Sequence, residues 1–157
     1  MAKSNVRLDY KELEKLKEQI EKIGDPIQMD KFLTSCAKEL AARLLAKVIK
    51  RTPVGDYPVE TGKKGGTLRR GWTGEQNSNA KAYVNSLTVN KVGTDYVIDI
   101  INPVFYASYV EYGHRTRNHK GWVEGKFMLT ISENEIRNSA PRILEKKLND
   151  YLKGCFK

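Results

Sequence analysis

Residues 30–50, with the sequence DKFLTSCAKELAARLLAKVIK, carry the clearest structural pattern of the chain. Apolar side chains recur there at three- and four-residue spacing and therefore share one broad face of an α-helix. That face comprises Leu33, Cys36, Ala37, Leu40, Ala41, Leu44, Leu45 and Val48. Thr52-Pro53 is expected to end the helix, because proline disfavours a helical conformation in the residue before it. We predict a long helix in which Cys36 is a buried structural thiol.

Weaker patterns on either side predict two further helices. Residues 9–23 have a narrow apolar stripe among charged side chains, and Gly24, reinforced by Pro26, is expected to end that helix. Residues 127–152 predict a C-terminal helix that contains Pro141. Either this helix bends at Pro141 or a new helix begins there.

The middle of the chain predicts a small β region. We expect strands over 82–89 and 96–101, joined by a hairpin turn at 90–93, and then a short helix with an aromatic face over 105–112. The expected fold class is α+β, with a small antiparallel β-sheet packed by a long helix, an N-terminal amphipathic helix and a C-terminal helix.

The length of 157 residues fits a single domain, 1–157. Within it, the helix over 1–24 is a candidate docking arm, and residues 25–157 form the main body with long polar loops at 53–67 and 113–126. No apolar run approaches the ~20 residues of a membrane span, and the N-terminus lacks a secretory pattern. Cys36 and Cys155 are the only cysteines, too few for a disulfide framework.

The formal net charge is +9, and its distribution is uneven. The basic excess is greatest in residues 31–52, where Glu39 is the only acidic residue. A basic surface favours nucleic acid, an acidic membrane or an acidic protein as its partner, and charge alone does not choose among them.

Two segments have a superficial likeness to catalytic or ligand-binding motifs. The glycine-rich stretch 62–67 lacks the glycine spacing and the strand-to-helix context of a phosphate-binding loop. His114 and His119 are too few for a metal site, and neither has a serine or cysteine nucleophile beside it in any known motif. We therefore expect no enzyme activity, no metal and no cofactor.

Basic and aromatic residues alternate in two further segments, 68–72 (LRRGW) and 112–117 (YGHRTR), with Trp122 nearby. Arginine beside aromatic rings suits a protein interface. The same residues can also clamp phosphates and stack on bases, so a nucleic-acid interface stays open.

Two blocks of sequence resemble a known family. The first comprises 46–54 (AKVIKRTPV), Thr61-Gly62 and 67–72 (TLRRGW); the second comprises 101–103 (INP), 106–116 (YASYVEYGHRT) and 121–127 (GWVEGKF). They resemble a phage minor tail-component family of neck, head–tail joining and tail-completion proteins, typified by the tenth gene product of a lambdoid siphophage. The resemblance spans residues 37–153 and omits the N-terminal helix; 55–60 and 63–66 are insertions relative to the family pattern.

The resemblance implies a structural virion protein of the neck or tail, made in the cytoplasm of the bacterial host. It implies a ring, expected to be a hexamer, that joins tail to head. The expected partners are further copies of the chain, adjacent neck, connector or tail-tube rings, and DNA in the channel, but no membrane. Two alternatives remain: a tail terminator ring that caps the tail tube, and a basic DNA-binding module that uses Arg69, Arg70, Arg115, Arg117 and the two tryptophans.

We predict that the interface between subunits or rings uses the basic and aromatic segments. The residues expected there are Arg69, Arg70, Trp72, Tyr109, Glu111, His114, Arg115, Arg117, Trp122 and Phe127.

Overall fold

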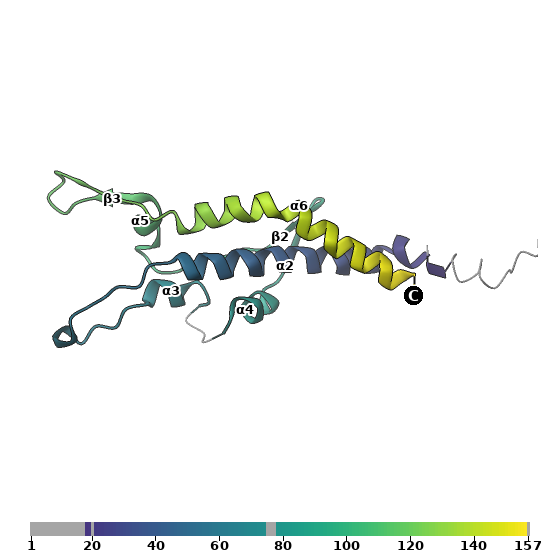
Figure 1. Ribbon diagram of the computed structural model, residues 1–157, viewed down its shortest axis with the longest axis horizontal. Helices are drawn as coiled ribbons and strands as arrows, with labels where there is room; N and C mark the ends of the chain where they lie inside the picture. Colours follow the sequence, from purple (N-terminus) through teal and green to yellow (C-terminus); the bar gives the residue numbers. More distant parts are fainter. Residues whose placement is uncertain (1–17, 20, 75–77, 157) are drawn as a thin grey trace, which may run out of the picture.

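The computed structural model describes residues 18–19, 21–74 and 78–156. Two long helices, α2 (Pro26–Arg51) and α6 (Met128–Cys155), lie side by side and run in opposite directions along the long axis of the molecule (Figure 1). Residues 18–19 and 21–24 are helical as well. The rest of the helix predicted over 9–23 lies outside the described residues.

Helix α2 begins earlier than the pattern of apolar residues predicted. Asp25 is its N-cap, with Oδ1 accepting a hydrogen bond from the Ile27 amide at 3.0 Å, and Pro26 occupies the first helical position. The prediction that the helix starts at residue 30 was wrong. Proline can mark the end of one helix and can also occupy the first position of the next, and Pro26 does the second here. The end at Arg51, with Thr52 as the C-cap, is confirmed.

The apolar face of α2 is also confirmed. Leu45 and Val48 are fully buried, and Cys36 is 8% exposed. Burial raises the pKa of the Cys36 thiol, more than the nearby charge of Lys147 lowers it. The prediction of a buried structural thiol therefore holds.

Three short helical elements follow α2 where a polar connection and a strand were expected. They are η1 (Val59–Thr61), α3 (Thr67–Gly71) and α4 (Ala80–Ser86). The strand predicted over 82–89 was wrong. Asn79 caps α4 through a hydrogen bond from the Ala82 amide at 2.8 Å, and Val84 is buried against the core. Tyr83, Val84 and Leu87 fit one face of a helix as well as they fit a strand, and the cap decides between the two.

The β structure consists of two separate antiparallel hairpins. Strands β1 (Asn90–Val92) and β2 (Asp95–Val97) pair with Lys91 opposite Tyr96, and strands β3 (Gly113–Arg115) and β4 (Trp122–Glu124) pair with His114 opposite Val123. The α+β class is confirmed. The first hairpin turns after Val92 and not over 90–93, and the expected loop 113–126 contains the second hairpin.

The hydrophobic core lies around the C-terminal half of α2. There α2 meets α3, α4 and the first turn of α6, while α5 (Ala107–Tyr112) covers its edge through Val110. The buried cluster comprises Ala41, Leu45, Val48, Leu68, Trp72, Val84 and Met128. The packed elements are therefore mainly helices, and both hairpins extend from their margins (Figure 1).

Pro141 lies inside α6, which continues through it. Figure 1 shows α6 changing direction about halfway along its length. Proline removes one backbone hydrogen bond and displaces the preceding turn, so a bend is the expected result. Of the two alternatives drawn from the sequence, the bent helix is the one observed.

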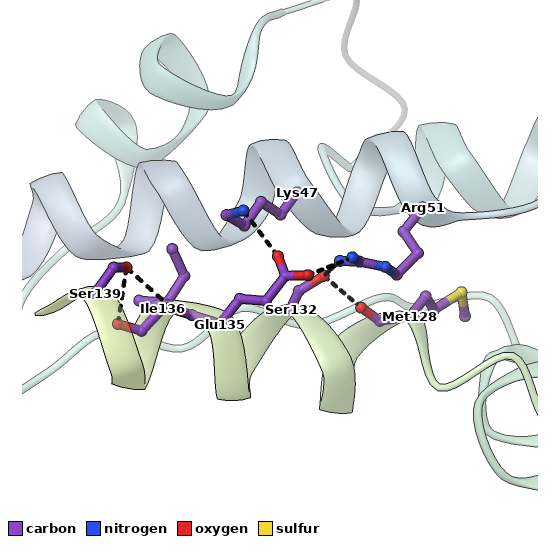
Figure 2. A network of polar contacts seen from close by, with 7 residues as sticks. All are labelled: Lys47, Arg51, Met128, Ser132, Glu135, Ile136 and Ser139. Atoms are coloured by element: carbon purple, nitrogen blue, oxygen red, sulfur yellow. Dashed lines mark hydrogen bonds and ion pairs between the residues drawn. The ribbon is translucent and has the colours of Figure 1, made fainter.

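Glu135 of α6 joins the two long helices by ion pairs (Figure 2). Its carboxylate accepts from Lys47 Nζ at 2.8 Å and from Arg51 Nη2 at 2.6 Å. Arg51 Nη1 also donates to the buried Ser132 hydroxyl at 2.9 Å, and Ser132 donates to the Met128 carbonyl. Hydrogen bonds from Lys47 and Arg51 lower the pKa of Glu135 below its ordinary value of 4.5.

We predict that Glu135→Gln lowers the melting temperature at neutral pH. Since the folded-state pKa of Glu135 is lowered, its contribution is present above about pH 4.5 and is lost as pH falls through that lowered pKa. Thermal unfolding from pH 7 to pH 2 should show the wild-type and variant curves converging in acid. Glu133→Gln, which removes the same charge from an exposed pair with Arg137 on α6, is the matched control. Equal effects of both variants would contradict the prediction.

Candidate functional site

Arg69 and Trp72 of the LRRGW segment face the interior of the subunit. Trp72 is 4% exposed, and its indole Nε1 donates to the Thr52 hydroxyl at 2.8 Å. Arg69 donates through Nη2 to the Thr52 carbonyl at 2.7 Å. Both side chains therefore attach α3 to the end of α2. Because the Trp72 side chain is buried within the subunit, it is not available to contact a partner.

Asn102 joins the same cluster from a distant part of the chain. Its side-chain amide donates to the Leu68 carbonyl at 2.8 Å, and its Oδ1 accepts from the Val104 amide at 3.1 Å. A Cβ on Gly71 would collide with Asn102, so α3 can approach this segment only with glycine at that position. The segments 52–53, 67–72 and 101–103, which carried the family resemblance, therefore meet in space and hold the fold.

Glu111 is another expected interface residue that lies inside the subunit, at 4% exposure. Its two carboxylate oxygens accept from the Leu129 and Thr130 amides at 2.9 and 2.8 Å, and from the Thr130 hydroxyl at 2.7 Å. These amides belong to the first turn of α6, whose N-cap residue, Phe127, supplies no side-chain cap. Glu111 therefore caps α6 from α5, and its negative charge favours the positive end of the helix dipole.

The outward face of α5 carries an aromatic surface. Phe105, just before the helix, is 86% exposed, and Tyr109 and Tyr112 are 55% and 61% exposed. Trp122 on β4 and Phe127 at the start of α6 are exposed as well. We call Phe105, Tyr109, Tyr112, Trp122 and Phe127 the aromatic surface. These side chains come from neighbouring elements, and exposed aromatic residues of this kind are typical of an interaction site.

Hairpin β3–β4 extends beyond this surface at one end of the molecule (Figure 1). Gly113 begins it with φ +84°, and a Cβ at Gly113 would press against the backbone near Gly125. His114 is half-buried, its Nδ1 lies 2.9 Å from the Arg115 carbonyl, and its ring meets Tyr109 edge-on at 5.8 Å. Arg115 and Arg117 are exposed on the hairpin.

The 53–66 segment forms a second projection at the same end of the molecule (Figure 1). Val54, Tyr57 and Val59 are exposed along it. A cavity of about 240 Å³ lies at its base, between the projection, α3 and α5. Its lining includes Val54, Tyr57, Leu68, Tyr106 and Val110.

The described residues offer no support for the catalytic or ligand-binding motifs considered from the sequence. They contain no group of three or more His, Cys, Asp or Glu side chains that could hold a metal ion. The 62–67 stretch follows η1 and leads into the five-residue α3, and a phosphate-binding loop joins a strand to a helix. Among residues 18–19, 21–74 and 78–156, no helix has the length and apolarity needed to cross a membrane.

Two contributors to this end of the molecule were not named as site residues from the sequence. Phe105 was assigned only to the aromatic face of a short helix, and Tyr112 to that face and to the basic and aromatic segment 112–117. Their exposure could have been predicted from the sequence. The short helix has aromatic or apolar residues on both sides, so the residues on one side have to remain exposed to solvent. The hairpin over 113–124 was missed because its strands are only three residues long, too short to show a periodic pattern.

The subunit has a small helical core, with exposed aromatic side chains near one end and two projections at that end (Figure 1). A family model described as "Bacteriophage HK97-gp10, putative tail-component" matches residues 14–113, and the chain belongs to this family. The match begins inside the first predicted helix and not at residue 37, and it ends at Gly113, before β4 and α6. No curated protein and no solved structure matches the chain.

We predict that Glu111→Gln destabilises the protein by about 1–3 kcal/mol, since the new amide group sets a donor against the N–H donors of α6. Chemical denaturation at neutral pH measures the change. Glu124→Gln on exposed β4 makes the same change of charge and serves as the control, with an expected effect within about 0.5 kcal/mol. A Glu111→Gln variant as stable as this control would show that the cap contributes nothing.

Proposed function

We propose that the chain forms a closed ring in the neck or tail-completion region of the phage particle and joins tail to head. The observation that carries the proposal is the exposed aromatic surface of α5, β4 and Phe127 in a member of a tail-component family. Covering a large apolar side chain contributes about 1.5–3 kcal/mol, so contact with a neighbour would strongly favour assembly. The ring is proposed to contain six copies, the number that the family resemblance implies.

A closed ring requires a heterologous contact, in which one patch meets a different patch on the next copy. The aromatic surface is one candidate patch. The second is the 53–66 projection, because it exposes Val54, Tyr57 and Val59 and has the 240 Å³ cavity at its base. The 53–66 projection and the elements that carry the aromatic surface, α5 and hairpin β3–β4, are separate parts of the same end of the subunit (Figure 1).

Of the residues expected at the interface from the sequence, the exposed ones fit this proposal directly. Tyr109, Trp122 and Phe127 form part of the aromatic surface, whereas Arg115 and Arg117 are exposed on hairpin β3–β4 and are considered separately below. Arg70 is exposed on α3, beside the 53–66 projection, where it donates to the Gly65 carbonyl at 3.2 Å. Arg69, Trp72 and Glu111 contribute indirectly by holding α3, α5 and α6 in place.

We predict that Tyr109→Glu and Trp122→Glu abolish incorporation of the subunit into particles, because each would bury a carboxylate in the proposed contact. The measurement is complementation of a phage that lacks the gene, followed by electron microscopy and analysis of purified particles. Val92→Glu, on exposed β1 away from the aromatic surface, is the control and should be incorporated normally.

The same micrographs distinguish the possible rings. Tails of normal length without heads support tail completion, whereas tubes of uncontrolled length would assign the chain to the tail terminator. Folding of each variant is checked by circular dichroism. Particles that incorporate folded Tyr109→Glu and Trp122→Glu as well as the wild type would refute the proposed interface.

A further inference from the structure

The tip of hairpin β3–β4 is strongly basic. Arg115, Arg117, His119 and Lys120 are all exposed, and none of them forms an ion pair within the described part of the chain. Glu124 is the only acidic residue in the segment 113–126, against Arg115, Arg117, Lys120 and Lys126. Among the described residues these side chains therefore have no ion-pair partner, and all of them are exposed.

The backbone of the tip is held in one conformation by its own hydrogen bonds. The Thr116 hydroxyl donates to Asn118 Oδ1 at 2.6 Å and accepts from the Gly121 amide at 3.0 Å. Asn118 Oδ1 also accepts from the Lys120 amide at 3.1 Å, and the Thr116 amide donates to the Gly121 carbonyl at 2.9 Å. A tip ordered in this way loses less conformational entropy when its cations engage a partner.

The composition of the tip favours a polyanion over a protein surface. Residues 115–120 (RTRNHK) include no apolar side chain, and protein interfaces depend on a buried apolar centre. Exposed cations without an apolar centre are the combination that binds the phosphate backbone of nucleic acids.

The hairpin tip differs from Arg69, Arg70 and Trp72, which the sequence also suggested as candidates for DNA binding. Arg69 and Trp72 are engaged with Thr52 inside the subunit. Arg70 donates to the Gly65 carbonyl at 3.2 Å and to the Thr67 hydroxyl at 3.4 Å. In the part of the chain that the structure describes, the hairpin tip thus has two exposed arginines two positions apart that form no ion pair.

We infer that the hairpin tip binds the phosphate backbone of double-stranded DNA without sequence preference. The choice of DNA rests on the proposed function, since DNA crosses a ring that joins head to tail. A two-stranded β-ribbon has the width to enter the major groove, where Arg115, Arg117 and Lys120 can reach phosphates on both sides.

The test measures binding of the full-length protein to a fluorescent 20-base-pair duplex by anisotropy across a salt series from about 20 to 200 mM. The test variant replaces Arg115, Arg117 and Lys120 with Gln. The control variant replaces Arg142, Lys146 and Lys153 of α6 with Gln; these side chains are also exposed and form no ion pair among the described residues, and the change in net charge is identical. We expect the hairpin variant to lose tenfold or more in affinity, and the slope of log K against log salt to fall by about 2 to 3. The control should change the slope by less than about 1.

Three results would overturn the inference: no binding of the wild type at 20 mM salt, equal losses in the two variants, or equally tight binding to polyglutamate of matched charge. The last would assign the tip to an acidic protein. Incorporation of the hairpin variant into particles is scored separately. If the wild-type protein enters particles but does not bind DNA, this inference alone is overturned. If the Tyr109→Glu and Trp122→Glu variants enter particles normally, the ring proposal is overturned and the DNA-binding result is unaffected.

Discussion

Thr52 is the residue on which the arrangement of this subunit depends. Its hydroxyl donates to the Val48 carbonyl, ending α2, and accepts from the buried indole of Trp72, while its carbonyl accepts from Arg69. The residue is fully buried, so each of these polar groups needs its partner inside the protein. Because α3 is held there, residues 53–66 leave the core and return to it within a short distance, and they form a projection.

The Glu111 cap fixes the base of hairpin β3–β4, just as Thr52 fixes the base of the 53–66 projection. By accepting from the Leu129 and Thr130 amides, Glu111 sets the start of α6 against α5, and the intervening chain closes as hairpin β3–β4. A buried carboxylate on a helix N-terminus tolerates little displacement, since each lost hydrogen bond leaves an unpaired group. The aromatic surface and the basic tip are therefore presented by a rigid base, while their own side chains remain free to meet other molecules.

Sequence patterns predicted the long helices well and the smaller elements poorly. Over 30–50 the apolar period persists for several turns, so α2 could be placed, and Cys36 with it. Residues 82–89 are too short for periodicity to separate helix from strand, and the cap at Asn79 made the segment helical. The motif residues Arg69, Trp72 and Glu111 were expected on a surface. Trp72 and Glu111 proved to be buried and Arg69 partly buried, because a polar or aromatic residue in a motif can equally satisfy a partner within the subunit.

The sequence by itself determined the α+β class, the two long helices, the buried thiol and the family, because repeating apolar positions and local motifs are written in consecutive residues. Only the tertiary structure decided which polar and aromatic side chains remain outside. Trp72 is buried because Thr52, twenty positions earlier, offers it a hydroxyl, and Trp122 is exposed because none of the described elements covers it. Burial is a property of neighbours distant in the chain, and a single sequence does not show which neighbours meet.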